Sequence, residues 1–270
     1  MKVKLYSQYN HFPGHIAAPE EPAALELWND GKIWEYIDRG FARGGSALLI
    51  EPRSLQPQTY RLVENYYHRF DNIFTHDSQL LAELPNAQRI IYWNEYEMHD
   101  EPKTKNFSMI CGSKDMCPLH NLRQHLAEAI KDRVDILGDW KGGSRCSIAE
   151  AYANYKFAVV IENYIDDYWF TEKILNAFAS KTVPIYLGAR KIGEFFNPDG
   201  IIQVENLWQV VTVIEYITAS GIDREYSDRA AAIEGNYLRV HSYRNFEEWF
   251  FYHYGDREER NDIIYNNPIL

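Results

Sequence analysis

The feature that most constrains the fold is an alternation of short apolar runs with amphipathic segments along most of the chain. In the first third, residues 57–70 carry apolar and aromatic residues at helical spacing, and residues 21–39 do so with an interruption at Asn29-Asp30-Gly31. The apolar runs between these segments predict buried strands at residues 2–6, 46–51, 72–75 and 89–93. Strands that alternate with helices are typical of parallel, doubly wound sheets.

A polar, proline-containing stretch at residues 97–106 is the best candidate for a linker, and the alternation restarts after it. We therefore predict an α/β protein of two Rossmann-like domains facing a cleft, with a single mixed sheet as the competing arrangement. The N-terminal domain would cover residues 1–100, and the C-terminal domain residues 106–245. The aromatic end, residues 246–270, is predicted to be a helical segment that packs across both.

Charge and cysteine content limit the class of protein. The formal net charge is -11, which argues against a basic face that coats nucleic acid, although a small cationic pocket needs only two or three basic residues. The three cysteines cannot all pair, which favours a reducing compartment. No segment approaches the roughly 20 apolar residues of a membrane span. These features predict a soluble, cytoplasmic protein, with peripheral attachment at the inner membrane face as an alternative; they do not indicate an oligomeric state.

The most informative stretch is ENYIDDYWFTEK, residues 162–173, which lies between an apolar strand-like run and a helix-like segment. Loops of this kind lie at the ligand-binding edge of a parallel sheet. Thr171 is a good N-cap, and a helix N-terminus together with Lys173 suits a phosphate group. Glu172 can accept hydrogen bonds from sugar hydroxyls. The alternative is that Glu172 and Lys173 only decorate a solvated helix start.

Residues 155–189, YKFAVVIENYIDDYWFTEKILNAFASKTVPIYLGA, resemble the signature of glycosyltransferase family 10, the α-1,3/1,4-fucosyltransferases. The resemblance lies in the order and spacing of YKF, EN, TEK, NAF and VPIYLG. It implies a GT-B fold in which the C-terminal domain supplies most of the binding site for GDP-fucose. It also implies that transfer inverts the configuration of the anomeric carbon.

The resemblance assigns donor-binding roles residue by residue. Lys173 and Glu172 match the family's phosphate-binding Lys and ribose-binding Glu, Thr171 begins the same TEK motif, and Glu162 and Asn163 match the EN pair that closes the preceding strand.

Two positions near this motif need separate comment. Trp169 stands where the family has a Tyr, and it can stack and donate one N–H but cannot replace a hydroxyl. The adjacent Tyr168 is a candidate substitute. The resemblance also places a phosphate-binding Arg early in the helix after the first strand of the C-terminal domain, where Arg123 stands. A guanidinium binds phosphate oxygens in a bidentate fork, but Arg123 could instead be a solvated helix residue.

An inverting transfer needs a carboxylate that accepts the proton of the acceptor hydroxyl. Glu51 follows a predicted strand of the N-terminal half and is the first choice, while Glu95, in the sequence NEYE, is the rival. Either could be a structural carboxylate. The Asp166-Asp167 pair also suggests a divalent metal, but a required metal or other cofactor is not expected, since Arg123 and Lys173 would already neutralise a diphosphate.

The sequence as a whole therefore predicts an inverting fucosyltransferase that moves fucose from GDP-fucose to a glycan hydroxyl, such as that of GlcNAc in a bacterial surface polysaccharide. Three alternatives remain open. The same scaffold could use a different nucleotide sugar, it could be a catalytically silent nucleotide- or glycan-binding module, or the chain could be a structural interaction protein.

Overall fold

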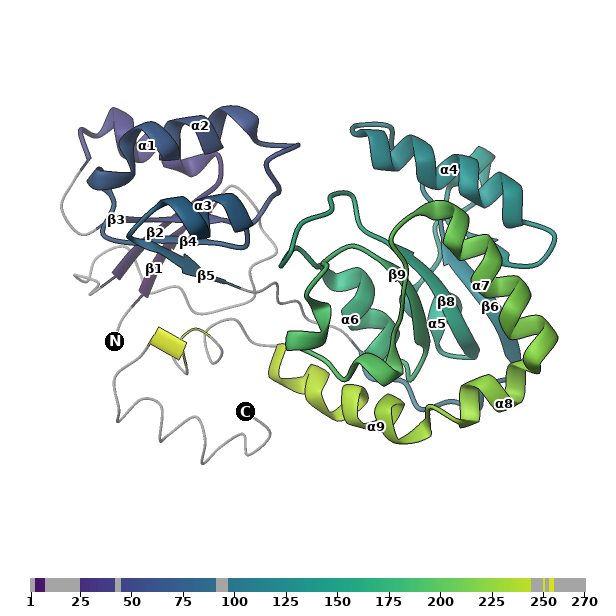
Figure 1. Cartoon of the computed structure of the whole chain (residues 1–270). Helices are drawn as coiled ribbons and strands as arrows, with labels where there is room; N and C mark the ends of the chain where they lie inside the picture. The colour runs from purple at the N-terminus through teal and green to yellow at the C-terminus, as the bar shows by residue number, and fades with distance from the viewer. Residues whose placement is uncertain are drawn as a thin grey trace.

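The computed structural model describes residues 3–7, 25–41, 45–90, 97–243, 250 and 253–254, which form two parallel five-stranded sheets (Figure 1). The fold is α/β of the GT-B type, and the competing single mixed sheet is wrong. Residues 97–104 carry the chain from the first sheet to the second without regular structure, within the stretch predicted to be a linker.

The first sheet has its strands in chain order, β1-β2-β3-β4-β5, and every neighbouring pair is parallel. Its strands are β1 (Val3–Tyr6), β2 (Leu25–Asn29), β3 (Gly45–Leu49), β4 (Ile73–Thr75) and β5 (Ala87–Arg89). The helices that connect them are α1 (Lys32–Asp38), α2 (Pro57–Tyr66) with the short η1 (Tyr67–Arg69), and α3 (Ser78–Glu83).

One predicted helix of this half is wrong in its first part. Within residues 21–39, Leu25–Asn29 form the strand β2 and only Lys32–Asp38 form a helix. The strand lies between β1 and β3, and Leu27 and Trp28 are fully buried. A strand covered on both faces is apolar on both faces, so its side chains do not show the period of two that identifies a half-buried strand.

The second sheet has the strand order β10-β9-β8-β6-β7, again all parallel. Its strands are β6 (Lys105–Ile110), β7 (Asp135–Leu137), β8 (Tyr155–Ile161), β9 (Val183–Leu187) and β10 (Ile202–Gln203). The α-helices of this half are α4 (Pro118–Ile130), α5 (Ile148–Tyr152), α6 (Glu172–Ala179), α7 (Leu207–Ser220), α8 (Ile222–Ser227) and α9 (Ala230–Arg239). Short 3-10 turns are η2 (Trp140–Gly142), η3 (Ile192–Glu194), η4 (Pro198–Gly200) and η5 (Val240–Tyr243).

The central strand β8 shows how helices cover both faces of this sheet. Phe157, Val159 and Ile161 pack into the core beneath α4 and α7, whereas Ala158 and Val160 pack into the core beneath α5 and α6. Alternate residues of a strand point to opposite faces, so a strand buried on both sides becomes a continuous apolar run. This burial holds β8 and its outgoing loop in a fixed position.

The end of the chain reaches the first half of the molecule. Phe250 and Tyr254 pack against Phe74 of β4 with ring centroids 5.1 and 5.0 Å apart, and the Tyr254 hydroxyl donates a hydrogen bond to the Arg89 carbonyl. The rest of the predicted segment at residues 246–270 lies outside the described residues, apart from His253. So do residues 91–93 of the strand that was predicted at 89–93, of which the observed β5 includes only Arg89.

Candidate functional site

The order of strands locates a ligand site in the second sheet. From β6 the chain crosses through α4 to β7 on one side, and then through α5 to β8 on the other side of β6. This reversal is a topological switch point, where the loops leaving the carboxyl ends of adjacent strands diverge and leave a crevice suited to ligands. The loops concerned are residues 111–117, which lead into α4, and residues 162–171, which lead into α6.

The loop after β8 is built on the buried carboxylate of Glu162. Its Oε1 accepts a hydrogen bond from the Thr171 main-chain N–H at 2.9 Å, and its Oε2 accepts from the Thr171 hydroxyl at 2.8 Å and from Lys173 Nζ at 3.2 Å. Thr171 is the N-cap of α6, as predicted from the sequence. Both oxygens of Glu162 are therefore engaged within the protein, so its carboxylate anchors the loop and the helix entrance.

Charges around Lys173 keep it cationic. Burial lowers the pKa of Lys173, but the carboxylates of Glu162 and Glu172 more than offset this and raise its pKa above the ordinary value. Burial in turn raises the pKa of Glu162. The Lys173 side chain is 26% exposed and Glu172 is 36% exposed, so both can reach a ligand at the mouth of the loop.

Trp169 uses its single N–H within the loop. Its Nε1 donates to Asn163 Oδ1 at 3.1 Å and so orients the Asn163 side chain. The Trp169 ring is buried and packs on His76 of the first half, with centroids 4.2 Å apart. Trp169 therefore supports the loop from behind and joins it to the other half of the molecule.

Tyr168 makes a different set of contacts from the residues around Lys173. Its hydroxyl accepts a hydrogen bond from Lys191 Nζ at 3.0 Å, and the Arg89 guanidinium lies 4.9 Å from the centre of its ring. The structure thus gives Tyr168 partners beside β9 and β5. It does not bring Tyr168 together with Arg123 or Lys173 in any hydrogen bond of the described residues.

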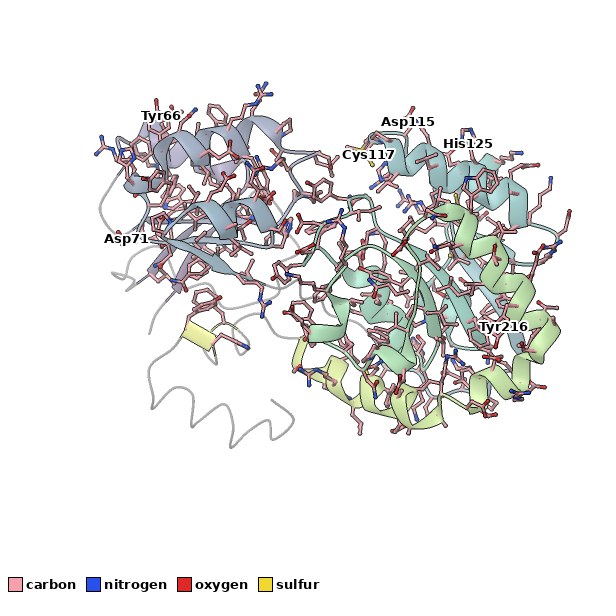
Figure 2. All side chains as sticks on the ribbon, viewed as in Figure 1. Tyr66, Asp71, Asp115, Cys117, His125 and Tyr216 are labelled. Atoms are coloured by element: carbon pink, nitrogen blue, oxygen red, sulfur yellow. The ribbon has the colours of Figure 1, made fainter. Side chains whose placement is uncertain are left out.

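The entrance of α4 completes the cationic side of the site. Cys117 is the N-cap residue, and its thiol donates to the Asn163 carbonyl oxygen at 3.4 Å, which brings this entrance against the loop after β8. Arg123 lies in the second turn of α4 and has no ion pair within the described part of the chain. Its positive charge acts on both Lys173 and His120. Figure 2 shows Cys117 at the end of α4 nearest the first half, with His125 farther along the helix.

His120, in the first turn of α4, is a residue that sequence reasoning missed. The spacing of His120 and His125 places them on different faces of a helix, and the structure shows that His120 is buried and His125 exposed. The sequence did not single out His120 as a binding residue.

The first sheet places Glu51 at its own carboxyl edge, directly after β3. The main-chain N–H of Glu51 donates to both carboxylate oxygens of Asp30 at 3.3 Å, and that of Ile50 donates to Asp30 Oδ1 at 3.1 Å. The Tyr60 hydroxyl donates to the Glu51 carbonyl oxygen at 3.0 Å. Burial raises the pKa of Asp30 to about 7 and lowers the pKa of His76 to about 4.

These supports of Glu51, above all Asp30, were not identified from the sequence. Glu95, the rival candidate for the base, lies outside the described residues.

The two carboxyl edges meet through the loop after β8. Asp166 accepts hydrogen bonds from the Ser78 hydroxyl at 2.7 Å and from the Ser78 main-chain N–H at 3.2 Å, at the start of α3. Arg89 of β5 forms an ion pair with Glu194 at 2.8 Å. Residues 162–171, which carry most of the donor-site candidates and are called the donor loop below, therefore also dock on the first sheet.

The Asp166-Asp167 pair serves contacts within the protein. Asp166 binds Ser78, and Asp167 forms ion pairs with Lys191 at 3.1 Å and Arg190 at 3.4 Å. Among the described residues, no group of three or more His, Cys, Asp or Glu side chains could hold a metal ion. No helix in this same part of the chain is long and apolar enough to cross a membrane.

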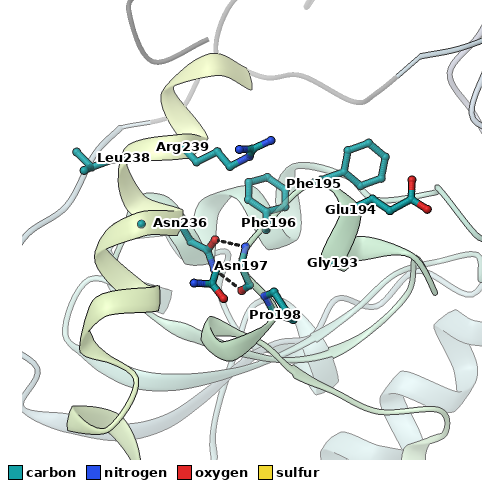
Figure 3. Close-up of a pocket in the computed structure, with 10 residues that line it drawn as sticks. Gly193, Glu194, Phe195, Phe196, Asn197, Pro198, Asn236, Leu238 and Arg239 are labelled. Atoms are coloured by element: carbon teal, nitrogen blue, oxygen red, sulfur yellow. Dashed lines mark hydrogen bonds between the residues drawn. The ribbon is translucent and has the colours of Figure 1, made fainter.

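A separate pocket of about 450 Å³ lies between the turns η3 and η4 and the end of α9 (Figure 3). Asn236 holds its wall together by accepting from the Asn197 main-chain N–H at 2.8 Å and donating to the Asn197 carbonyl at 3.0 Å. None of the predicted donor-binding residues lines this pocket, so it is not the switch-point site.

Comparison with known proteins identifies the second half of the chain. The family model described as glycosyltransferase family 10 (fucosyltransferase), C-terminal region, matches residues 102–228. Residues 102–228 are therefore similar to the C-terminal region of family 10 glycosyltransferases. The matched region contains β6 to α8, and therefore the switch point and every predicted donor-binding residue.

Two relatives support the family 10 assignment. The α-(1,3)-fucosyltransferase FucT of Helicobacter pylori is 24% identical over 186 residues, which are 63% of this chain and 37% of that protein. An α-(1,4)-fucosyltransferase of Arabidopsis thaliana is 33% identical over 92 residues, which are 32% of this chain and 23% of that protein. The chain thus spans well under half the length of these relatives.

A solved structure of an α1,3-fucosyltransferase with GDP has the same fold, with a TM-score of 0.53 and 17% sequence identity. The match covers 78% of this chain and 69% of that one. At this level of identity the likeness concerns the fold alone.

Proposed function

We propose that the chain is an inverting glycosyltransferase that moves fucose from GDP-fucose to a hydroxyl group of a glycan. The observation that carries the proposal is the convergence of Lys173 and Arg123 at the entrances of two helices, at the switch point of a region that resembles family 10. Arg123 has no ion pair in the part of the chain that the structure describes. The GDP bound to the structural neighbour supports the choice of nucleotide.

The cationic side of the site would hold the pyrophosphate of the donor. Main-chain N–H groups at the entrances of α4 and α6 and the charges of Arg123 and Lys173 all favour an anion there. They would also stabilise the charge that develops on GDP as the glycosidic bond breaks. Glu172 would accept hydrogen bonds from ribose hydroxyls, and Asn163, oriented by Trp169, would position the donor beside them.

The opposite edge would supply the base. In this scheme the carboxylate of Glu51 takes the proton of the acceptor hydroxyl while the acceptor oxygen forms a bond to C1 of fucose. The bond between C1 and the phosphate oxygen breaks, and its electron pair leaves with GDP. A single displacement of this kind inverts the anomeric configuration, and Asp30 and Tyr60 hold the main chain that carries the base.

The acceptor, the cellular compartment and the metal requirement are proposed on the same basis. The acceptor would be a glycan of a bacterial surface polysaccharide, with transfer at the cytoplasmic side of the membrane. We also propose that transfer needs no divalent metal, because Arg123, Lys173 and two helix entrances provide the positive charge; addition of EDTA should leave the rate unchanged.

The test is a panel of GDP-fucose, GDP-mannose and UDP-sugars, offered with glycan acceptors to the wild type and to Glu51→Gln. We expect transfer from GDP-fucose, a product whose H1 coupling shows inversion, and a loss of about 10²–10⁴ in kcat for Glu51→Gln with GDP affinity unchanged. Glu83→Gln, an exposed carboxylate on α3, is the matched control.

Other outcomes of the panel would identify the alternatives. Transfer from another nucleotide sugar would show that GDP-fucose is not the donor. This alternative is suggested by Trp169, which stands where the family has a Tyr. Binding of GDP-fucose without transfer or hydrolysis would indicate a silent binding module. Wild-type turnover in Glu51→Gln would mean that another carboxylate is the base, and Glu95 would be the next candidate.

A further inference from the structure

We propose that His120 is a third pyrophosphate-binding residue of this site, one that donates a ring N–H to the diphosphate beside Arg123 and Lys173. The inference rests on the proposed function, since it assigns a further residue to the same nucleotide site. It concerns a position outside the TEK and EN motifs, and it comes from the burial and neighbours of one side chain.

The first observation is that His120 is buried without being satisfied. Its side chain is 6% exposed, and its Nδ1 has no hydrogen-bond partner among the described residues. A buried polar atom that lacks a partner costs free energy, and most such atoms in proteins are paired. Arg123 shows the same feature, because its Nε is also buried and unpartnered within the described part of the chain. Two side chains one turn apart on α4 thus each hold a buried nitrogen that has no hydrogen-bond partner among the described residues.

The second observation is the charge around the imidazole. Apart from burial, the pKa of His120 is lowered by Arg123, Lys114 and Lys173, and only Asp115 acts in the opposite direction. These are the charged groups that act on it from α4, from the loop before α4 and from α6. The cations that act most strongly on His120 outnumber the carboxylates that do so, although Lys173 itself lies beside Glu162 and Glu172, and this balance favours an anion over a metal ion.

The position of His120 in the helix completes the geometry. It lies in the first turn of a 13-residue helix whose N-cap, Cys117, contacts the Asn163 carbonyl of the donor loop. The partial positive charge at the N-terminal end of such a helix favours an anion. A diphosphate bound there would supply the acceptor that Nδ1 lacks. Its negative charge would also reverse the effect of the three cations, so that His120 takes up a proton from solvent on binding.

The experiment is calorimetric titration of the whole chain with GDP at pH 7 in two buffers of different ionisation enthalpy, which counts protons taken up on binding. Gln cannot take up a proton, and its amide nitrogen lies farther from the main chain than Nδ1 of His. We therefore expect His120→Gln to weaken GDP binding about tenfold or more, as for loss of a hydrogen bond to a charged group, and to take up fewer protons than the wild type. His125→Gln, on an exposed turn of the same helix, should match the wild type in both measurements.

A second measurement is made on the wild type and does not depend on whether a variant folds. The imidazole Cε1–H resonance of His120 in the wild type should titrate at a higher pH with GDP bound than without it. If His120→Gln binds GDP with wild-type affinity and proton uptake, or the resonance does not move, the role of His120 is overturned while the nucleotide site stands. If the wild type and His125→Gln also fail to bind GDP, the proposed function is overturned together with the inference.

Discussion

The two sheets of this protein differ in what they carry at their carboxyl edges. The first sheet runs in chain order, and its edge presents Asp30, Glu51 and Asp77, with Arg53 bound to Asp77 at 2.9 Å. The second sheet reverses between β6 and β8, and its edge presents Arg123 and Lys173. One fold principle, a parallel sheet covered by helices, thus produces an edge whose candidate catalytic group is a carboxylate and a second edge, here called the cationic edge, where Arg123 and Lys173 lie beside Glu162 and Glu172.

This difference separates two tasks of a glycosyl transfer. A base needs a carboxylate held in place, whereas a diphosphate leaving group needs converging cations and helix entrances. The reversal of strand order supplies the convergence in the second sheet, because it brings the entrances of α4 and α6 to one place. The first sheet, whose strands run in chain order, provides instead loop residues such as Glu51, whose main chain is held by the buried Asp30 and Tyr60.

Arg123→Ala should have the largest effect and tests directly whether the two edges have different functions. We expect turnover to fall about 10²–10³-fold, since the proposed role of Arg123 is to stabilise the departing GDP, while the fold stays intact because Arg123 has no ion pair within the described residues. Steady-state kinetics and thermal unfolding measure both effects. Arg133→Ala, which removes an exposed partner of Glu215, should change neither. Wild-type turnover in Arg123→Ala would remove the cationic edge from the mechanism.

A second prediction concerns the buried acid of the first sheet. Because the pKa of Asp30 is raised from 3.8 to about 7, the native state binds more protons than the unfolded state across this range, and stability falls as pH rises. Between pH 5 and pH 8 the loss attributable to Asp30 is about 3 kcal/mol.

Urea unfolding at several pH values tests this slope. Asp30→Asn should remove the pH-dependent loss, whereas Asp38→Asn, at an exposed position on α1, should keep it. Equal slopes for the wild type and Asp30→Asn would mean that Asp30 titrates like a solvated carboxyl group, and the support of Glu51 would need another explanation.

The smallest expected effect concerns the contact between the halves. Ser78→Ala removes the hydroxyl that donates to Asp166 at 2.7 Å, and we expect a loss of about 1 kcal/mol in the free energy of unfolding with a rise of a few-fold in the KM for the donor. Differential calorimetry should show the midpoint about 2–4 °C lower. Ser227→Ala, at an exposed position of α8, provides the control. An unchanged KM would show that the donor loop keeps its shape without docking.

Much of the donor loop could be predicted from local sequence. The strand ending before Glu162, the N-cap at Thr171 and the helix after it depend on neighbours in the chain, and the structure confirms all three. The resemblance to family 10 was readable for the same reason, since its motif is contiguous. The helix predicted over residues 21–39 was wrong in its first part because burial of β2 on both faces depends on which strands flank it.

The sequence by itself determined the composition of the site: a helix entrance with a Lys and a Glu, a strand-ending carboxylate, and an Arg on another helix. Only the tertiary structure decided how they are used. It directs Glu162 inward to Thr171 and Lys173, joins Trp169 to His76 across the two halves, and separates the buried His120 from the exposed His125. The physical reason is that the packing of the loop after β8 and its contact with the first half depend on the order of the strands, which leaves no local pattern of residues.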